Sequence, residues 1–158
     1  MHPLQSQRHD MQEKKKRLIL IGKSSAGKTT LCQRIANEDL KYHKTQTVQT
    51  FNENMIDTPG EYLERRAYRG ALMVTSYDAD VIIFVQDATE GGTMFPPSYA
   101  ATFTKPVVGV VSKCDLVSGN EIDIAEKYLQ MAGATEIFCI SSVTGEGVEA
   151  LMKHLGYA

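Results

Sequence analysis

The chain has 158 residues, of which 42% are hydrophobic, and this suits a single compact domain with one core. Its formal net charge of −2 gives no overall field that would attract nucleic acid or an anionic membrane, so we expect neither among its partners. No apolar run reaches the ~18 residues of a membrane span. The first residues lack the apolar centre of a signal peptide, so we expect a cytoplasmic protein whose three cysteines are reduced.

The first segment of the chain, residues 1–16, is polar and ends in a basic cluster. We expect it to be a flexible basic tail that precedes a single domain over residues 17–158. A charge run before a first strand is usually solvated, and contact with an acidic partner is the alternative.

Short apolar runs rich in Val and Ile predict strands that are covered on both faces, as in a parallel sheet. These runs are residues 18–22, 81–87, 107–112 and 137–141. Helical patterns lie between them, at residues 27–38, 61–77, 121–133 and 146–156. Residues 48–51 and 54–57 are predicted to form a short antiparallel hairpin at one edge. The pattern therefore predicts a doubly wound α/β fold with a mostly parallel sheet of about six strands and helices on both faces.

The stretch "GKSSAGKT", residues 22–29, matches the phosphate-loop pattern G-x-x-x-x-G-K-[ST] between a predicted strand and a predicted helix. Its glycines allow turns that direct backbone N–H groups at phosphates, and the helix N-terminus adds partial positive charge. Lys28 is expected to bridge the outer phosphates and the Thr29 hydroxyl to bind Mg²⁺. The predicted phosphate-binding residues are Gly22, Lys23, Ser24, Ser25, Ala26, Gly27, Lys28, Thr29, Thr30 and Gly60.

A second motif, "MIDTPGEY", follows some thirty residues later. Asp57 ends a short predicted strand, where its carboxylate can hold Mg²⁺, and Gly60 allows a backbone N–H to approach the terminal phosphate. A switch threonine that closes over the metal must lie before this motif. Thr47 has the better spacing for that role, and Thr45 is the alternative.

The stretch "VVSKCDL" comes directly after the third predicted parallel strand. A carboxylate can accept two hydrogen bonds from guanine, which presents N1–H and N2–H₂ side by side, whereas adenine has no such pair. We therefore expect Asp115 to read guanine and the Lys113 stem to cover the base, against the alternative of a surface turn. In "CISSVTGEG", the Ser142 N–H is expected to donate to guanine O6, with Val143 beside the base.

In order, "GKSSAGKT", "DTPG", "SKCD" and "SSV" resemble the motifs of the small P-loop GTPases. More narrowly, "IGKSSAGKTTL", "KTQTV", "IDTPGEY" and "VVSKCDL" resemble the EutP/PduV family of bacterial ethanolamine and propanediol utilisation. The resemblance implies association with a metabolic microcompartment and with its shell or enzyme proteins. It also implies a possible kinase, because acetate kinase activity has been ascribed to members.

Four positions depart from the common GTPase pattern. Ser112 is shorter than the Asn that usually tethers the base motif to the phosphate loop, and Val143 replaces a common Lys. Glu61 stands where many GTPases have a water-orienting Gln, and Ser24 stands where glycine is frequent. The last two changes predict slow unaided turnover. The expected catalytic residues are Lys28, Glu61 and Thr47, and the expected metal ligands are Thr29, Thr47 and Asp57.

Three functions remain open at this point. The first is a Mg²⁺-dependent guanine-nucleotide-binding protein that hydrolyses GTP slowly and switches between its GTP and GDP forms. The second is an ATP-dependent small-molecule kinase of the acetate kinase type, and the third is a nucleotide-binding scaffold with negligible turnover. A kinase for a small acceptor usually needs a lid to exclude water, and the pattern contains none, which favours the first.

Overall fold

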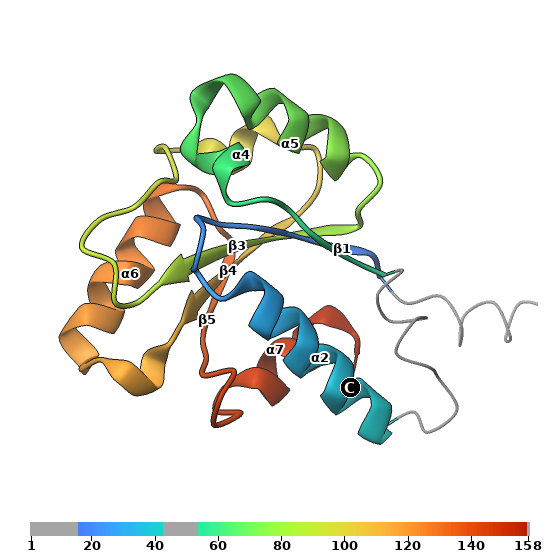
Figure 1. The fold of residues 1–158 in the computed structure, drawn as a ribbon, viewed down its shortest axis with the longest axis vertical. Coiled ribbons are helices and arrows are strands. Elements are labelled where there is room, and N and C mark those ends of the chain that lie inside the picture. Colours follow the sequence, from blue (N-terminus) through green and yellow to red (C-terminus); the bar gives the residue numbers. More distant parts are fainter. Residues whose placement is uncertain (1–15, 43–53, 158) are drawn as a thin grey trace, which may run out of the picture.

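The computed structural model describes residues 16–42 and 54–157, and its centre is a five-stranded, fully parallel sheet (Figure 1). The strand order is β2-β1-β3-β4-β5. The strands are β1 (Leu18–Ile21), β2 (Met55–Asp57), β3 (Val81–Asp87), β4 (Val107–Ser112) and β5 (Glu136–Cys139). This arrangement confirms the predicted doubly wound α/β fold.

Helices cover both faces of the sheet, as predicted (Figure 1). The α-helices are α2 (Lys28–Tyr42), α4 (Glu61–Glu64), α5 (Arg69–Ser76), α6 (Gly119–Met131) and α7 (Val148–Leu155). Three short 3₁₀ turns are η1 (Arg66–Tyr68), η2 (Tyr99–Thr102) and η3 (Cys114–Leu116). None of the helices within the described residues is both long and apolar enough to cross a bilayer.

Side chains of the central strands alternate between two hydrophobic layers, because successive residues of a strand point to opposite faces. Leu18 and Leu20 of β1 pack with α2 and α7 on one side. Ile19 and Ile21 pack on the other side with α4, α5 and α6. Because both sides of the strand are buried, β1 reads as a continuous apolar run rather than as an alternating one.

The predicted edge hairpin is described only in part. Its second half is β2, which pairs in parallel with β1, with Ile19 opposite Ile56. Residues 48–51, the predicted first half, lie outside the described residues, so the sheet has five described strands rather than about six.

The predicted helix over residues 61–77 is wrong as a single element. It is divided into α4, η1 and α5 because Arg65 has an extended backbone, with φ −105° and ψ 116°. Residue 16 also differs from the predicted tail: the Tyr157 hydroxyl donates a hydrogen bond of 2.6 Å to the Lys16 carbonyl. The rest of the predicted tail, residues 1–15, lies outside the described residues.

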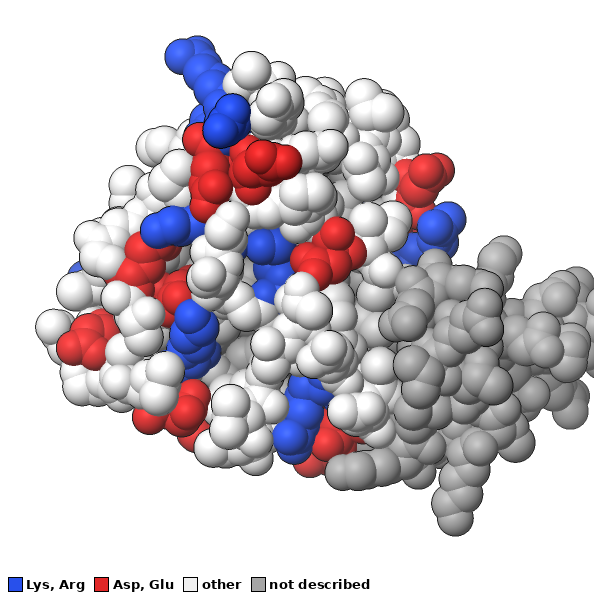
Figure 2. Space-filling view, viewed as in Figure 1, with Lys and Arg blue, Asp and Glu red and all other residues white. Residues whose placement is uncertain are grey.

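The carboxyl ends of parallel strands meet at one edge of the sheet, and this edge is where ligands bind in open α/β sheets. The segments that follow β1, β3, β4 and β5 therefore come together there. Acidic and basic side chains are interspersed over the face shown in Figure 2, without a large area of one sign among its described residues.

Candidate functional site

The loop between β1 and α2 folds tightly against the end of the sheet. Ser25 and Gly27 have positive φ angles of 67° and 99°, the conformation that turns the chain back towards the helix. Gly22 lies so close to β3 that a Cβ atom there would be 2.7 Å from the Val85 carbonyl oxygen. These turns deliver Lys28 and Thr29 to the first turn of α2.

Lys28 is buried beneath this loop, with 6% of its surface exposed. Its ammonium donates a hydrogen bond of 3.0 Å to the Lys23 carbonyl. Burial lowers the pKa of Lys28, and the nearby carboxylates of Asp57 and Glu64 partly oppose this lowering of the pKa. A buried cation of this kind is stabilised by further negative charge, such as a phosphate.

Thr29 and Asp57 meet at the start of α2, where the Thr29 hydroxyl donates a hydrogen bond to the Asp57 carboxylate. The position of Asp57 is fixed by its neighbour Thr58, whose hydroxyl donates to the Leu20 carbonyl at 2.7 Å. A hydroxyl and a carboxylate oxygen are hard ligands of the type that Mg²⁺ prefers beside phosphates, so this pair fits the expected ion.

The turn after β2 lies directly against the loop. A Cβ atom on Gly60 would overlap the Ser24 backbone, so only glycine allows this approach. The carboxylate that contacts the loop belongs to Glu64, whose Oε1 accepts a hydrogen bond of 3.0 Å from the Ser24 N–H. Glu61, the predicted catalytic residue, is exposed at the start of α4 and has no recorded hydrogen bond with the described part of the loop.

A cavity of about 200 Å³ lies at the other end of the loop. Its walls include all four predicted base-binding residues. The lining residues are Gly27, Thr30, Ser112, Lys113, Asp115, Leu116, Ser142 and Val143. Leu116 and Val143 are 66% and 78% exposed, so two large apolar side chains border the opening of the cavity. The Asp115 carboxylate has no hydrogen-bond partner among the described residues, and an apolar wall with one such carboxylate suits a base.

A second cavity, of about 270 Å³, is lined by Ser25, Gly27, Lys28, Thr29, Thr30 and Lys113. Gly27, Thr30 and Lys113 border both cavities. The two cavities therefore adjoin at these residues, and together they make up a trough with Lys28 and Thr29 at one end and Asp115 at the other.

Ser112 tethers the base motif to the loop despite being shorter than asparagine. Its hydroxyl donates a hydrogen bond of 2.5 Å to the Ala26 carbonyl. This hydrogen bond forms because β4 brings Ser112 directly beside the loop.

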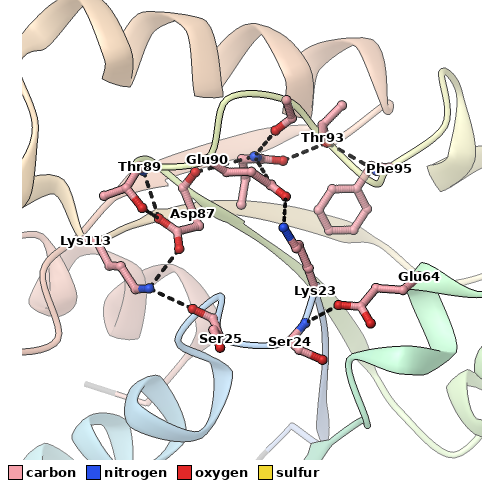
Figure 3. Close-up of polar contacts among 12 residues, drawn as sticks. Lys23, Ser24, Ser25, Glu64, Asp87, Thr89, Glu90, Thr93, Phe95 and Lys113 are labelled. Carbon is pink, nitrogen blue, oxygen red and sulfur yellow. Dashed lines mark hydrogen bonds and ion pairs between the residues drawn. The ribbon is translucent and has the colours of Figure 1, made fainter.

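Lys113 makes a second tether, shown in Figure 3. Its ammonium is 2.7 Å from the Ser25 carbonyl and 2.8 Å from the Asp87 carboxylate. Burial alone would raise the pKa of Asp87, but hydrogen bonds from Lys113 and Thr89 hold that pKa below its usual value. Asp87 therefore stays ionised as the partner of Lys113, which positions the stem of Lys113 along the trough.

The segment after β3 also reaches the loop, which the sequence analysis did not anticipate. Glu90 pairs with Lys23 at 3.1 Å (Figure 3). The buried Gln86 amide fixes this carboxylate by donating to Glu90 at 2.9 Å and accepting from the Thr93 hydroxyl at 2.7 Å. A buried Gln at the end of an apolar strand is the sequence signal that marks this network, because such an amide needs partners.

Arg34 of α2 is another residue that the sequence analysis missed. Its guanidinium makes long hydrogen bonds of 3.4 Å and 3.5 Å to the carbonyls of Ser142 and Val143. It is held by Glu38 at 3.2 Å, one helical turn away. The sequence signal for Arg34 is its spacing of four residues from Thr30, which borders the base cavity, because residues at this spacing share one face of a helix.

Thr47 and its alternative Thr45 lie outside the described residues. All other predicted site residues are described and line one edge of the sheet. The predicted roles of these residues in binding and catalysis remain predictions.

A family model described as "Ethanolamine utilisation - propanediol utilisation" matches residues 15–157. The chain belongs to this PduV-EutP family. It is 40% identical over 140 residues to propanediol utilization protein PduV of Citrobacter freundii, covering 89% of this chain and 93% of PduV. It is 28% identical over 141 residues to the probable acetate kinase EutP of Escherichia coli K12, covering 89% of both chains.

Solved structures share the fold of this chain. Elongation factor SelB of Methanococcus maripaludis, solved with the GTP analogue GppNHp, has a TM-score of 0.62 at 20% identity. The match covers 90% of this chain and 33% of SelB. The FeoB G-domain of Methanococcus jannaschii has a TM-score of 0.59 at 18% identity, with 90% of this chain and 96% of that domain covered. At these identities the likeness establishes the fold alone.

Proposed function

We propose that this PduV-EutP protein is a Mg²⁺-dependent guanine-nucleotide-binding protein, a slow GTPase-like switch that serves ethanolamine or propanediol utilisation. The observation that carries this proposal is the Asp115 carboxylate, which has no hydrogen-bond partner among the described residues and lies in an apolar-walled cavity beside the phosphate-loop cavity. Guanine presents two adjacent donors to a carboxylate and adenine does not, so Asp115 favours guanine.

At the base end, each residue has a distinct task. Asp115 accepts from the guanine edge, and the Ser142 N–H donates to O6. Val143 and Leu116 cover the ring, together with the stem of Lys113. Since the described residues leave the Asp115 carboxylate and the Ser142 N–H without hydrogen-bond partners, both are available to a ligand.

At the phosphate end, the loop N–H groups and Lys28 bind the phosphates, with Gly60 approaching the terminal one. Thr29 and Asp57 would hold Mg²⁺, and Thr47 is the proposed third ligand. When bound, the ion neutralises charge that builds up on the phosphate oxygens. Hydrolysis is slow in this proposal because Glu61 stands where many GTPases have a neutral Gln. Its carboxylate adds a negative charge to that of the terminal phosphate and does not favour attack by water.

The family's description supports our proposal for the cellular setting. Its description names ethanolamine and propanediol utilisation, and a relative with 40% identity is named a propanediol utilization protein. We place the protein in the cytoplasm, in association with a metabolic microcompartment and with its shell or enzyme proteins as partners.

A second candidate function is favoured by one observation, the 28% identity to the probable acetate kinase EutP. Under this alternative the protein transfers the terminal phosphoryl group of ATP to a carboxylate such as acetate. Lys28 and an arginine would then stabilise the transferring group.

The test is a calorimetric titration with GTP and with ATP, each with Mg²⁺, on the native chain and on Asp115→Asn. We expect the native chain to prefer GTP and the variant to lose about 1–3 kcal/mol of GTP binding, the value of one bidentate base contact. Asp123→Asn, which removes an exposed carboxylate on α6, is the matched control. Unchanged GTP affinity in Asp115→Asn would remove the base-reading role. ATP binding that equals GTP binding and tightens with acetate would favour the kinase.

A further inference from the structure

The backbone N–H of Ser24 already has an anionic partner within the chain. Glu64 Oε1 accepts its hydrogen bond at 3.0 Å, and this contact joins α4 to the phosphate loop (Figure 3). Ser24 lies in the loop whose N–H groups bind phosphate under the proposed function. A carboxylate oxygen and a phosphate oxygen accept the same kind of hydrogen bond, so they compete for one donor.

Glu64 also acts on the second phosphate-binding group, the ammonium of Lys28. It is one of two carboxylates that raise the pKa of Lys28 against the larger lowering caused by burial, and Asp57 is the other. Asp57 has a separate task in its pairing with Thr29. Glu64 belongs to none of the motifs, yet it combines a hydrogen bond to a loop N–H with an attraction to the loop lysine.

The structure holds this carboxylate in place through its helix. Leu63, the preceding residue, is buried in the core, and the Arg69 guanidinium donates to the Leu63 carbonyl at 3.0 Å. At the other end of α4, the Gly60 backbone lies against Ser24. The carboxylate therefore leaves Ser24 either by a change of its own side-chain rotamer or by a shift of α4.

We propose that Glu64 is a specificity-determining residue that competes with the terminal phosphate for the Ser24 N–H and so weakens triphosphate binding relative to diphosphate binding. This inference rests on the proposed function, since it takes the loop to be a nucleotide site. A triphosphate has to displace the carboxylate, because two anions repel each other and cannot share one donor. A diphosphate held by the helix end of the loop leaves the Glu64 contact intact. The binding energy of the terminal phosphate is thus coupled to the position of α4.

The experiment compares Glu64→Gln with the native chain by calorimetric titration of four nucleotides, GDP, ADP and non-hydrolysable analogues of GTP and ATP. We expect Glu64→Gln to bind the GTP analogue about tenfold more tightly, the size of one charge-assisted hydrogen bond removed from competition. GDP affinity should change by less than about twofold, because the proposed position of the diphosphate leaves the Glu64 contact intact. Glu149→Gln, an exposed glutamate on α7, is the control for the lost charge.

A second variant separates the effect of side-chain length from the effect of charge. Glu64→Asp keeps the negative charge but is one methylene shorter, so it should tighten triphosphate binding less than Glu64→Gln does. Because the chain contains no tryptophan, Tyr62→Trp provides a single tryptophan on α4, whose emission can be excited separately from that of the tyrosines. We expect its emission to change with the GTP analogue and to stay constant with GDP.

The outcomes distinguish this inference from the proposed function. An unchanged ratio of triphosphate to diphosphate affinity in Glu64→Gln would overturn the inference, and so would equal tightening of both. Either result leaves guanine selectivity intact. A preference for the ATP analogue would instead overturn the proposed function, while the triphosphate to diphosphate ratio would still test Glu64. Failure of the native chain to bind any of the four nucleotides would overturn both.

Discussion

At the scale of single residues, Lys28 combines two opposing electrostatic effects. Burial disfavours its charged form and lowers its pKa, whereas Asp57 and Glu64 favour the charged form. Under the proposed function a nucleotide adds several negative charges beside the ammonium. Its pKa must then be higher in the complex than in the free protein.

This difference predicts proton uptake on binding. At a pH between the free and bound pKa values of Lys28, the free lysine is partly neutral and the bound lysine is charged, so binding takes up a proton. Affinity therefore falls as the pH rises through the lowered pKa of the free protein, which lies below 10.5. Titrations through the alkaline range in two buffers of different ionisation enthalpy should give apparent enthalpies that differ between the buffers where the free lysine titrates.

Inorganic triphosphate is the control ligand for this prediction, because it has no guanine N1–H that titrates in the alkaline range. It should show the same dependence on the buffer. Apparent enthalpies that agree between the buffers for both ligands would contradict the assignment of Lys28 to the phosphates.

At the scale of elements, α2 serves both ends of the trough. Its first turn supplies Lys28 and Thr29, while Thr30 borders the base cavity. Arg34, one turn further on, bonds to the carbonyls of Ser142 and Val143. Gly145 completes this contact, since a Cβ atom there would overlap the Arg34 guanidinium. Arg34 is therefore a positioning residue for the Ser142 N–H.

We predict that Arg34→Met weakens GTP binding by about 0.5–1.5 kcal/mol, the value of ordinary hydrogen bonds, because the Ser142 loop loses its anchor while the apolar stem is kept. ATP binding should not change, because adenine has no O6 to accept from the Ser142 N–H. Calorimetric titration with both nucleotides measures this difference, and Arg34→Lys should restore part of the loss. Lys127→Met, an exposed lysine of α6, is the control. Equal weakening of GTP and ATP would assign Arg34 a general structural role instead.

The sequence predicted most elements well and failed at α4 for a physical reason. Continuous Val- and Ile-rich runs identified β1, β3, β4 and β5, because strands that are buried on both faces have no polar alternation. The pattern over residues 61–77 predicted one helix, since it contains no proline and a single glycine, Gly70, costs a helix only about 1 kcal/mol. Tertiary contacts decided otherwise: Arg65 is extended, and Arg69 folds back to the Leu63 carbonyl.

At the scale of the whole molecule, the parallel sheet explains which parts of the site could be predicted. The motif residues come directly after strands, and parallel strands end at the same edge, so Thr29, Asp57 and Asp115 could be placed together from sequence alone. Glu64, Glu90 and Arg34 could not, because they reach the site through side-chain contacts between separate elements. The buried Gln86 and the spacing of Arg34 from Thr30 are local signals for two of these residues, but neither signal identifies the partner in the other element.

The proposed switch and the alternative kinase differ in what they require of the whole molecule. The described residues form the sheet and the helices that cover it, and a phosphotransferase has to shield its acceptor from water. We therefore predict intrinsic GTP hydrolysis on the order of 10⁻³ s⁻¹ or slower, as for an unassisted small GTPase. Single-turnover assays of nucleotide and phosphate, with and without acetate, measure this rate. Acetate should leave the rate unchanged and yield no acyl phosphate.

Unaided turnover of about 1 s⁻¹ would contradict the slow switch, since kinases work in that range. Acetyl phosphate formed from ATP would replace the switch with the kinase, and Glu61 and Ser24 would then no longer mark slow hydrolysis.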